Sequence, residues 1–156
     1  MGGAMNISLL SLPPAETRAG FDQVLACFSA RESGNRSPFA FCDLGEEAAV
    51  VEELLLRAGA GELAGLAAFG GAVLGDDGVG TACTLLSVEE VTRLHAFLTT
   101  TGTSLTAHLA DVLSVTVRGD VPYGYADDLI ELVGELHGLF ETAARDGFCV
   151  VHLYEG

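Results

Sequence analysis

The sequence contains no lysine, so its seven arginines carry all of the positive side-chain charge. Against them stand 22 aspartate and glutamate residues, and the formal net charge is −15. Proteins that bind nucleic acid or anionic lipid surfaces present clustered positive charge to phosphate groups. We therefore expect no nucleic-acid partner and no membrane partner. An acidic surface suits a basic protein instead.

Long apolar segments are also absent. Two uncharged stretches are Met1–Ala15, which has no basic start and no long apolar centre, and Leu63–Gly75, which is too short and too rich in glycine to cross a bilayer. The sequence thus predicts a cytoplasmic protein. Its 156 residues have the size of one domain, which we place at residues 5–156, with residues 1–4 as a disordered leader or expression remnant.

Cysteine is scarce, and its four copies, at positions 27, 42, 83 and 149, form no close pair. Their neighbours are mostly apolar, which is typical of buried free thiols rather than of disulfides or metal ligands. This pattern fits a reducing compartment.

No sequence motif of a known chemistry is present. Gly-x-Ser-x-Gly, His-Glu-x-x-His and paired Cys-x-x-Cys are missing, and the glycine-rich segment Gly59–Gly80 lacks the spacing of a phosphate-binding loop. The four histidines, at 95, 108, 137 and 152, have no acidic residue or cysteine placed beside them by a recognisable motif. We therefore predict no catalytic, cofactor-binding or metal-binding residues. The sequence favours a protein that is not an enzyme.

Pairs of adjacent acidic residues mark the starts of predicted helices. Glu46-Glu47, Glu89-Glu90 and Asp127-Asp128 fall in first turns, where a carboxylate gains about 0.3–1 kcal/mol from the helix dipole. Asp76-Asp77 precedes Gly78 and predicts a turn. Only Glu52-Glu53 has no local structural explanation. We interpret most of the acidic residues as solvated helix starts rather than as an imitation of nucleic acid.

Local patterns predict alternating strands and helices. The predicted strands are Asn6–Leu12, Phe39–Cys42, Thr81–Leu86 and Phe148–Tyr154. The predicted helices run from Pro13-Pro14 through Phe28, from an Asp43 cap with Glu46 as a capping box to Gly59, over Glu62–Ala68, from the capping box Ser87-Val-Glu-Glu90 to about Thr101, and over Ala126–Asp146. Between Ala68 and Gly80 we expect an irregular packed connection.

The C-terminal segment is the best specified part of the chain. One arc of its helix must face the core, because it gathers Leu129, Leu132, Val133, Leu136, Leu139, Phe140 and Ala143. Gly147 ends the helix, and the strand that follows is apolar on both faces, which is typical of a strand inside a sheet. The sequence predicts an α+β fold, a single compact helix-rich domain with a small mixed sheet that includes the C-terminal strand.

The opposite face of the same helix carries Gly134 and Gly138, four residues apart. Each glycine costs about 1 kcal/mol relative to alanine inside a helix, so two on one exposed stripe need a reason. One interpretation is a glycine-rich composition. The other is close approach of another backbone, at an interface with a second copy or a protein partner. The residues of this predicted interface are Ile130, Gly134, His137, Gly138 and Glu141.

The order of motifs resembles the YfbM-like family of small bacterial proteins, a domain family of unknown function. The similar segments are Phe69–Gly75, Gly80 with Leu86–Val91, Val121–Tyr123, Leu139–Ala144, and Gly147 leading into Val150-Val151. This chain departs from the family where members usually carry a tryptophan and a histidine, which are Ala48 and Glu52 here, and at Val79–Cys83. The resemblance implies a single α+β domain with no established activity.

Two functions follow from these observations. The first is a non-catalytic protein-interaction or self-associating module, including an acidic inhibitor or immunity-type partner of a basic protein. The alternative is a small-molecule-binding protein or enzyme that uses the glycine-rich region 69–84 with a histidine such as His95 or His108.

The predicted interface on this helix can be tested by measuring the molecular mass of the protein in solution. If the stripe is a dimer seam, Gly138→Leu adds a large side chain at the contact and lowers the apparent mass in size-exclusion chromatography with light scattering. A mass equal to that of the unaltered protein would contradict the predicted interface.

Overall fold

The computed structural model describes residues 5–32, 39–101, 107–109, 112 and 124–156. Its strands are β1 (Asn6–Leu12), β2 (Phe41–Gly45), β3 (Ala72–Asp76), β4 (Thr81–Leu86) and β5 (Cys149–Glu155). Its helices are α1 (Pro14–Arg18), α2 (Phe21–Glu32), α3 (Ala48–Arg57), α4 (Glu62–Phe69), α5 (Val88–Thr101) and α7 (Tyr125–Asp146). The predicted leader, residues 1–4, lies outside this part of the chain, as does the segment Val121–Tyr123. None of the described helices is long and apolar enough to cross a membrane.

The strands form one sheet in the order β2-β1-β5-β4-β3, and every neighbouring pair is antiparallel. The predicted α+β class and the place of the C-terminal strand in the sheet are confirmed. The sheet is not mixed, however, because β3 and β4 form a tight hairpin and β5 runs opposite to both β1 and β4. A parallel neighbour would require a crossover connection between those strands.

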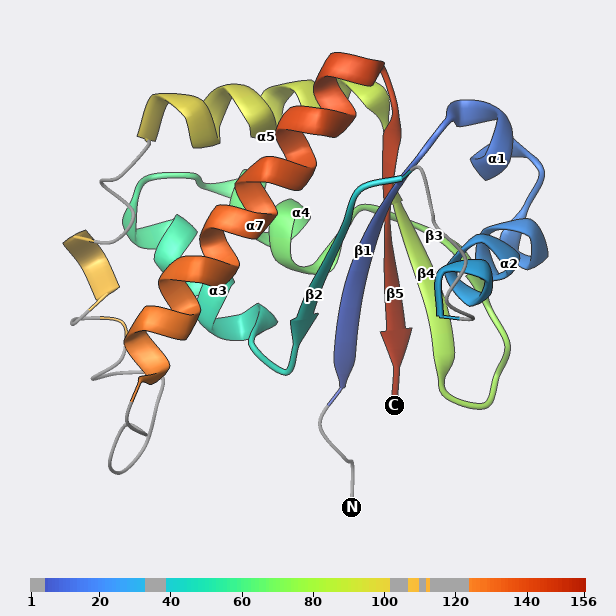
Figure 1. The fold of residues 1–156 in the computed structure, drawn as a ribbon, viewed down its shortest axis with the longest axis horizontal. Coiled ribbons are helices and arrows are strands. Elements are labelled where there is room, and N and C mark those ends of the chain that lie inside the picture. The colour runs from blue at the N-terminus through green and yellow to red at the C-terminus, as the bar shows by residue number, and fades with distance from the viewer. Residues whose placement is uncertain (1–4, 33–38, 102–106, 110–111, 113–123) are drawn as a thin grey trace.

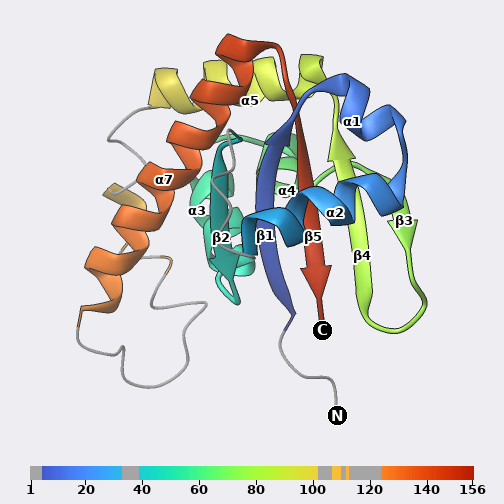
Figure 2. The same ribbon diagram turned by 45° about the vertical axis from the view of Figure 1, so that its right-hand side comes forward.

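Helices cover both faces of the sheet (Figures 1 and 2). Helices α1 and α2 lie on one face, and α3, α4, α5 and α7 lie on the other. Successive residues of β5 therefore enter different cores: Val150 packs with the larger group of helices, whereas Val151 and Leu153 pack with α2. The first five residues of β5 are buried, which confirms the prediction of an interior strand.

Several helix boundaries follow from local chemistry. The Ser87 Oγ accepts a hydrogen bond from the Glu90 N–H (3.2 Å), and the Glu90 carboxylate accepts one from the Ser87 N–H (2.9 Å), so the predicted capping box is confirmed. Helix α7 ends where Gly147 adopts a left-handed conformation with φ of 69°.

The predicted helix cap at Asp43 was wrong, and so was the single helix from Pro13-Pro14 through Phe28, which is divided into α1 and α2. Asp43 does not cap a helix, because pairing with β1 extends β2 through Gly45 and helix α3 begins only at Ala48. The Asp43 carboxylate instead accepts a hydrogen bond from the Gly45 N–H at 2.9 Å, within the turn that leaves the strand.

The expected irregular connection contains strand β3, which the sequence pattern did not reveal. Its glycines are required by close contacts: a Cβ at Gly75 would lie 2.5 Å from the Phe21 ring, and one at Gly71 would lie 2.6 Å from the Leu85 carbonyl oxygen. An alternating pattern of side chains could not identify this strand, because tertiary contacts leave no room for a side chain at Gly71 or Gly75.

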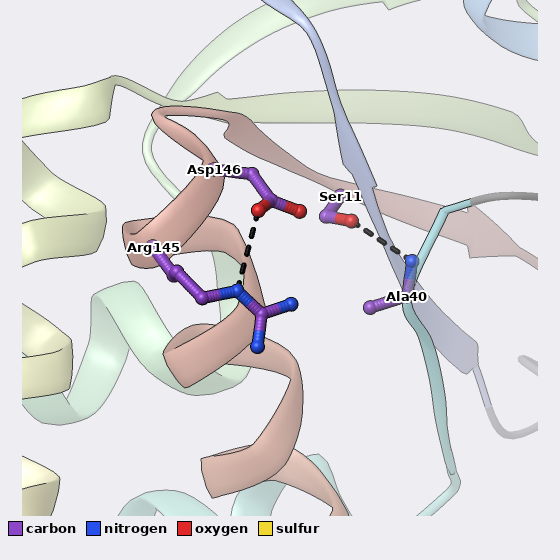
Figure 3. A network of polar contacts seen from close by, with 4 residues as sticks. All are labelled: Ser11, Ala40, Arg145 and Asp146. Atoms are coloured by element: carbon purple, nitrogen blue, oxygen red, sulfur yellow. Dashed lines mark hydrogen bonds and ion pairs between the residues drawn. The ribbon is translucent and has the colours of Figure 1, made fainter.

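A buried serine fixes the chain where it enters β2 (Figure 3). The Ser11 Oγ accepts a hydrogen bond from the Ala40 N–H, and the Ser11 N–H donates to the Ala40 carbonyl, both at 2.9 Å. Nearby in the same view, the Arg145 guanidinium lies 3.3 Å from the Asp146 carboxylate at the end of α7. The serine bonds extend the β1–β2 pairing beyond the end of β2.

Candidate functional site

An open groove of about 560 Å³ lies between the β2–α3 turn and helix α7. One wall carries the carboxylates of Asp43, Glu46 and Glu47, and the other carries those of Asp128, Glu131 and Glu135. We call these six side chains and the space between them the acidic groove. No arginine is among its described lining residues, so its charges have no internal counterion there.

Local structure explains only some of these carboxylates. Asp43 lies in β2 and accepts a hydrogen bond from the Gly45 N–H, Glu46 and Glu47 directly precede α3, and Asp128 lies in the first turn of α7. Glu131 and Glu135 lie further along α7, are exposed, and stand four residues apart. Like charges at this spacing repel each other and destabilise a helix. Their presence therefore has no local structural reason.

Two ionisable groups beside the acidic groove, Tyr125 and Cys42, have raised pKa values. The Tyr125 hydroxyl donates a hydrogen bond to the Glu47 carboxylate and so joins the start of α7 to the start of α3. Burial, with a contribution from Glu47, raises the pKa of Tyr125. Burial also raises the pKa of the Cys42 thiol to about 12, aided by the charges of Glu135 and Asp43. Both groups therefore stay protonated at neutral pH and add no charge to the groove.

A second group of polar side chains lies where α5 meets α7. One ligand atom each of His95, His137 and Glu141 lie within 4.8 Å of one another. The two imidazole rings have centroids 6.2 Å apart and are tilted by 41°, and the Thr99 hydroxyl lies 3.4 Å from His137 Nε2. Both histidines are half-buried and Glu141 is exposed. We call these three residues the His-His-Glu cluster.

The structure thus brings two residues of the predicted interface, His137 and Glu141, together with a histidine from another helix. Ile130, with 42% of its surface exposed, and the two glycines lie on the same side of α7, and a Cβ at either glycine would meet nothing within 4 Å in the described chain. His108 is half-buried and belongs to no such cluster of described residues. The signal for the cluster in the sequence was the four-residue spacing of His137 and Glu141, but nothing identified His95 as their neighbour.

In the glycine-rich region 69–84, Gly70 lies against His152. A Cβ at Gly70 would lie 1.9 Å from the Thr84 hydroxyl oxygen and 3.0 Å from His152 Nδ1. The hydroxyls of Thr84 and Tyr154 both donate to the Phe69 carbonyl. These contacts fill the space beside Gly70.

His152 is fully buried, and its Nε2 lies 2.9 Å from the Ala67 carbonyl oxygen. A carbonyl oxygen only accepts, so Nε2 carries the proton and Nδ1 is left as an acceptor without a hydrogen-bond partner among the described residues. Burial lowers the pKa of His152 to about 4, although the bond to Ala67 opposes the shift. The imidazole is therefore neutral at pH 7.

Comparison with known proteins leads to one solved structure. No family model matches the chain, and no curated protein matches its sequence. The crystal structure of YfbM from Escherichia coli, a protein of unknown function, superposes with a TM-score of 0.61 over 96% of this chain and 99% of that chain, at 12% sequence identity. The resemblance to YfbM-like proteins is confirmed in fold. At this identity the likeness to YfbM shows the architecture alone.

The buried histidine predicts a specific dependence of stability on pH. Its pKa is about 4 in the folded protein and 6.5 in the unfolded chain, so the unfolded chain binds the extra proton between these values. The free energy of unfolding therefore falls as pH drops from 6.5 towards 4. Between pH 7 and pH 5 the histidine contributes a loss of about 2 kcal/mol.

The variant His152→Gln retains a hydrogen-bond donor for Ala67 but does not titrate. Urea unfolding of both proteins at pH 7 and pH 5 measures the effect, and we expect the loss in the variant to be smaller by about 2 kcal/mol. Equal losses in both proteins would show that His152 is not held neutral by the fold.

The acidic groove predicts that removing charge stabilises the protein. Glu131→Gln with Glu135→Gln relieves repulsion across the groove and along α7, and should raise the free energy of unfolding by about 0.5–1 kcal/mol at low salt. The gain should shrink in about 1 M NaCl, because salt screens exposed charges. The control, Asp22→Asn with Glu89→Gln, removes the same charge from two helix starts and should give no gain.

Proposed function

We propose that this protein is a non-catalytic binding protein whose acidic groove takes a basic segment of a protein partner. The observation that carries the proposal is the convergence of six carboxylates on one groove that no described arginine lines. Carboxylates on both walls can form charge-assisted hydrogen bonds with guanidinium groups, which fit them in pairs. The net charge of −15 would steer a basic partner towards this surface.

The spacing of the groove residues suggests the form of the partner. Glu131 and Glu135 are four residues apart on α7, which separates them by about 6 Å along the helix axis. In an extended chain, residues two apart point to the same side and are separated by about 6.6 Å. An extended segment with arginine at alternate positions therefore matches the carboxylates of α7. An inhibitor or immunity-type protein would use such a groove to cover a basic site.

Self-association through the stripe Ile130, Gly134, His137, Gly138 and Glu141 is the second candidate. It is favoured by the open space at both glycines, which no described segment of the chain approaches. The small-molecule alternative in region 69–84 has less support, because close contacts among Gly70, Thr84 and His152 occupy that region.

Binding of defined peptides tests the groove. A labelled peptide with arginines at alternate positions should bind in a fluorescence anisotropy titration, and its affinity should fall as salt rises. Glu131→Gln with Glu135→Gln should weaken binding by about tenfold, which corresponds to about 1.4 kcal/mol from two charge-assisted contacts. A peptide of identical composition with its arginines in one block should bind more weakly.

The control is again Asp22→Asn with Glu89→Gln, which lowers the net charge equally but lies outside the groove. We expect it to change the affinity by less than about twofold. If both double variants weaken binding equally, the peptide responds to the total charge of the protein, and the groove is not the binding site.

A further inference from the structure

The His-His-Glu cluster has the composition of a site for a transition-metal ion. His137 and Glu141 are four residues apart and therefore share one face of α7, and α5 supplies His95 to the same place. Two imidazoles and one carboxylate are ligands that zinc and neighbouring divalent transition metals accept, whereas calcium and magnesium prefer oxygen ligands only. The donor set thus selects the class of ion.

The geometry of the cluster is compatible with coordination. Donor atoms around a tetrahedral zinc ion lie roughly 3.3 Å apart when each is about 2.0–2.1 Å from the metal. The three ligand atoms here already lie within 4.8 Å of one another. Because Glu141 is exposed and carries a flexible side chain, a rotamer change can bring its carboxylate closer to the two imidazoles.

We propose that His95, His137 and Glu141 bind one divalent transition-metal ion, with zinc as the best fit. Three protein ligands leave a fourth position of a tetrahedral ion open to water or to another ligand. The Thr99 hydroxyl of α5 lies 3.4 Å from His137 Nε2, so a polar contact already joins the two helices beside the cluster. Gly134 and Gly138 keep side chains away from the neighbouring surface of α7, so the ion can enter from solvent.

The site joins two helices that are far apart in sequence. His95 belongs to α5 and the other two ligands belong to α7, so a bound ion would link the helices directly. An ion that binds only the folded state raises the stability of that state according to its concentration and affinity. Metal binding should therefore be visible as thermal stabilisation as well as by titration.

Titration of the metal-free protein with Co²⁺, whose visible absorption reports its coordination, and with Zn²⁺ in calorimetry tests the proposal. We expect one ion per chain. His95→Ala, His137→Ala and Glu141→Gln should each weaken binding by at least about tenfold, because even loss of an outer partner of a metal ligand costs that much. The unfolding temperature of the unaltered protein should rise with Zn²⁺, and this rise should be lost in Glu141→Gln.

Matched controls separate this site from other histidines and from the acidic groove. His108→Ala and the double variant Glu131→Gln, Glu135→Gln should keep the metal affinity within about twofold, since neither removes a ligand. Glu141 is exposed, so its replacement by glutamine tests binding without endangering the fold. Peptide binding by Glu141→Gln should be unchanged, which makes the outcome independent of the proposed function.

The proposal is overturned if neither ion binds at concentrations up to about 1 mM, a limit that corresponds to a binding free energy near −4 kcal/mol. It is also overturned if Glu141→Gln and His95→Ala bind as tightly as the unaltered protein, or if only the groove variant loses affinity. The last result would place the ion among the groove carboxylates.

Discussion

Burial of β5 on both faces is the constraint on which the rest of the structure depends. The strand pairs with β1 on one side and with β4 on the other, and it carries side chains into the cores on both faces of the sheet. A polar residue in such a strand must be neutral and hydrogen-bonded, because solvation of a charge is lost. His152 is neutral and meets this demand at Nε2, through its bond to the Ala67 carbonyl, while Nδ1 has no partner among the described residues. The bond to Ala67 also ties α4 to the sheet.

The parts of the fold that the sequence predicted are those that depend on neighbouring residues. The β4 strand, the capping box at Ser87 and the length of α7 each follow from spacing within a few turns or residues. Strand β3 could not be recognised, because Gly75 within it and Gly71 just before it are required by contacts with Phe21 and Leu85, which come close only after folding. The N-cap assigned to Asp43 failed for a similar reason, since pairing with β1 outweighed the local capping signal. The residue pattern also does not show whether neighbouring strands run parallel or antiparallel.

The candidate sites show the same division. The acidic pairs in the first turns of α5 and α7 were predicted from the sequence, whereas Glu46-Glu47 precede α3 instead of lying in its first turn. The groove arises only because the β2–α3 turn lies against α7. The predicted interface on α7 included His137 and Glu141. In the structure, His95 of α5 lies close to these two residues. Helix α7 therefore serves the core, the groove and the cluster with different parts of its circumference. The periodicity of the sequence predicts which residues share one side of a helix, but the residues that lie opposite them depend on tertiary packing.

Strand β5 is synthesised after the other four strands but lies in the middle of the sheet. On the ribosome, β1 and β2 emerge first and β3 and β4 follow, yet the two pairs share no hydrogen bonds until β5 enters between them. Roughly 60 residues separate β4 from β5, so at about 5–20 residues per second the nascent chain holds two incomplete sheet fragments for several seconds. Isolated strand pairs are marginally stable in water, and the inner edges of β1 and β4 remain open during this interval. Folding of this domain therefore waits until β5 has been synthesised, and in the interval chaperones would have access to edges that the folded domain hides.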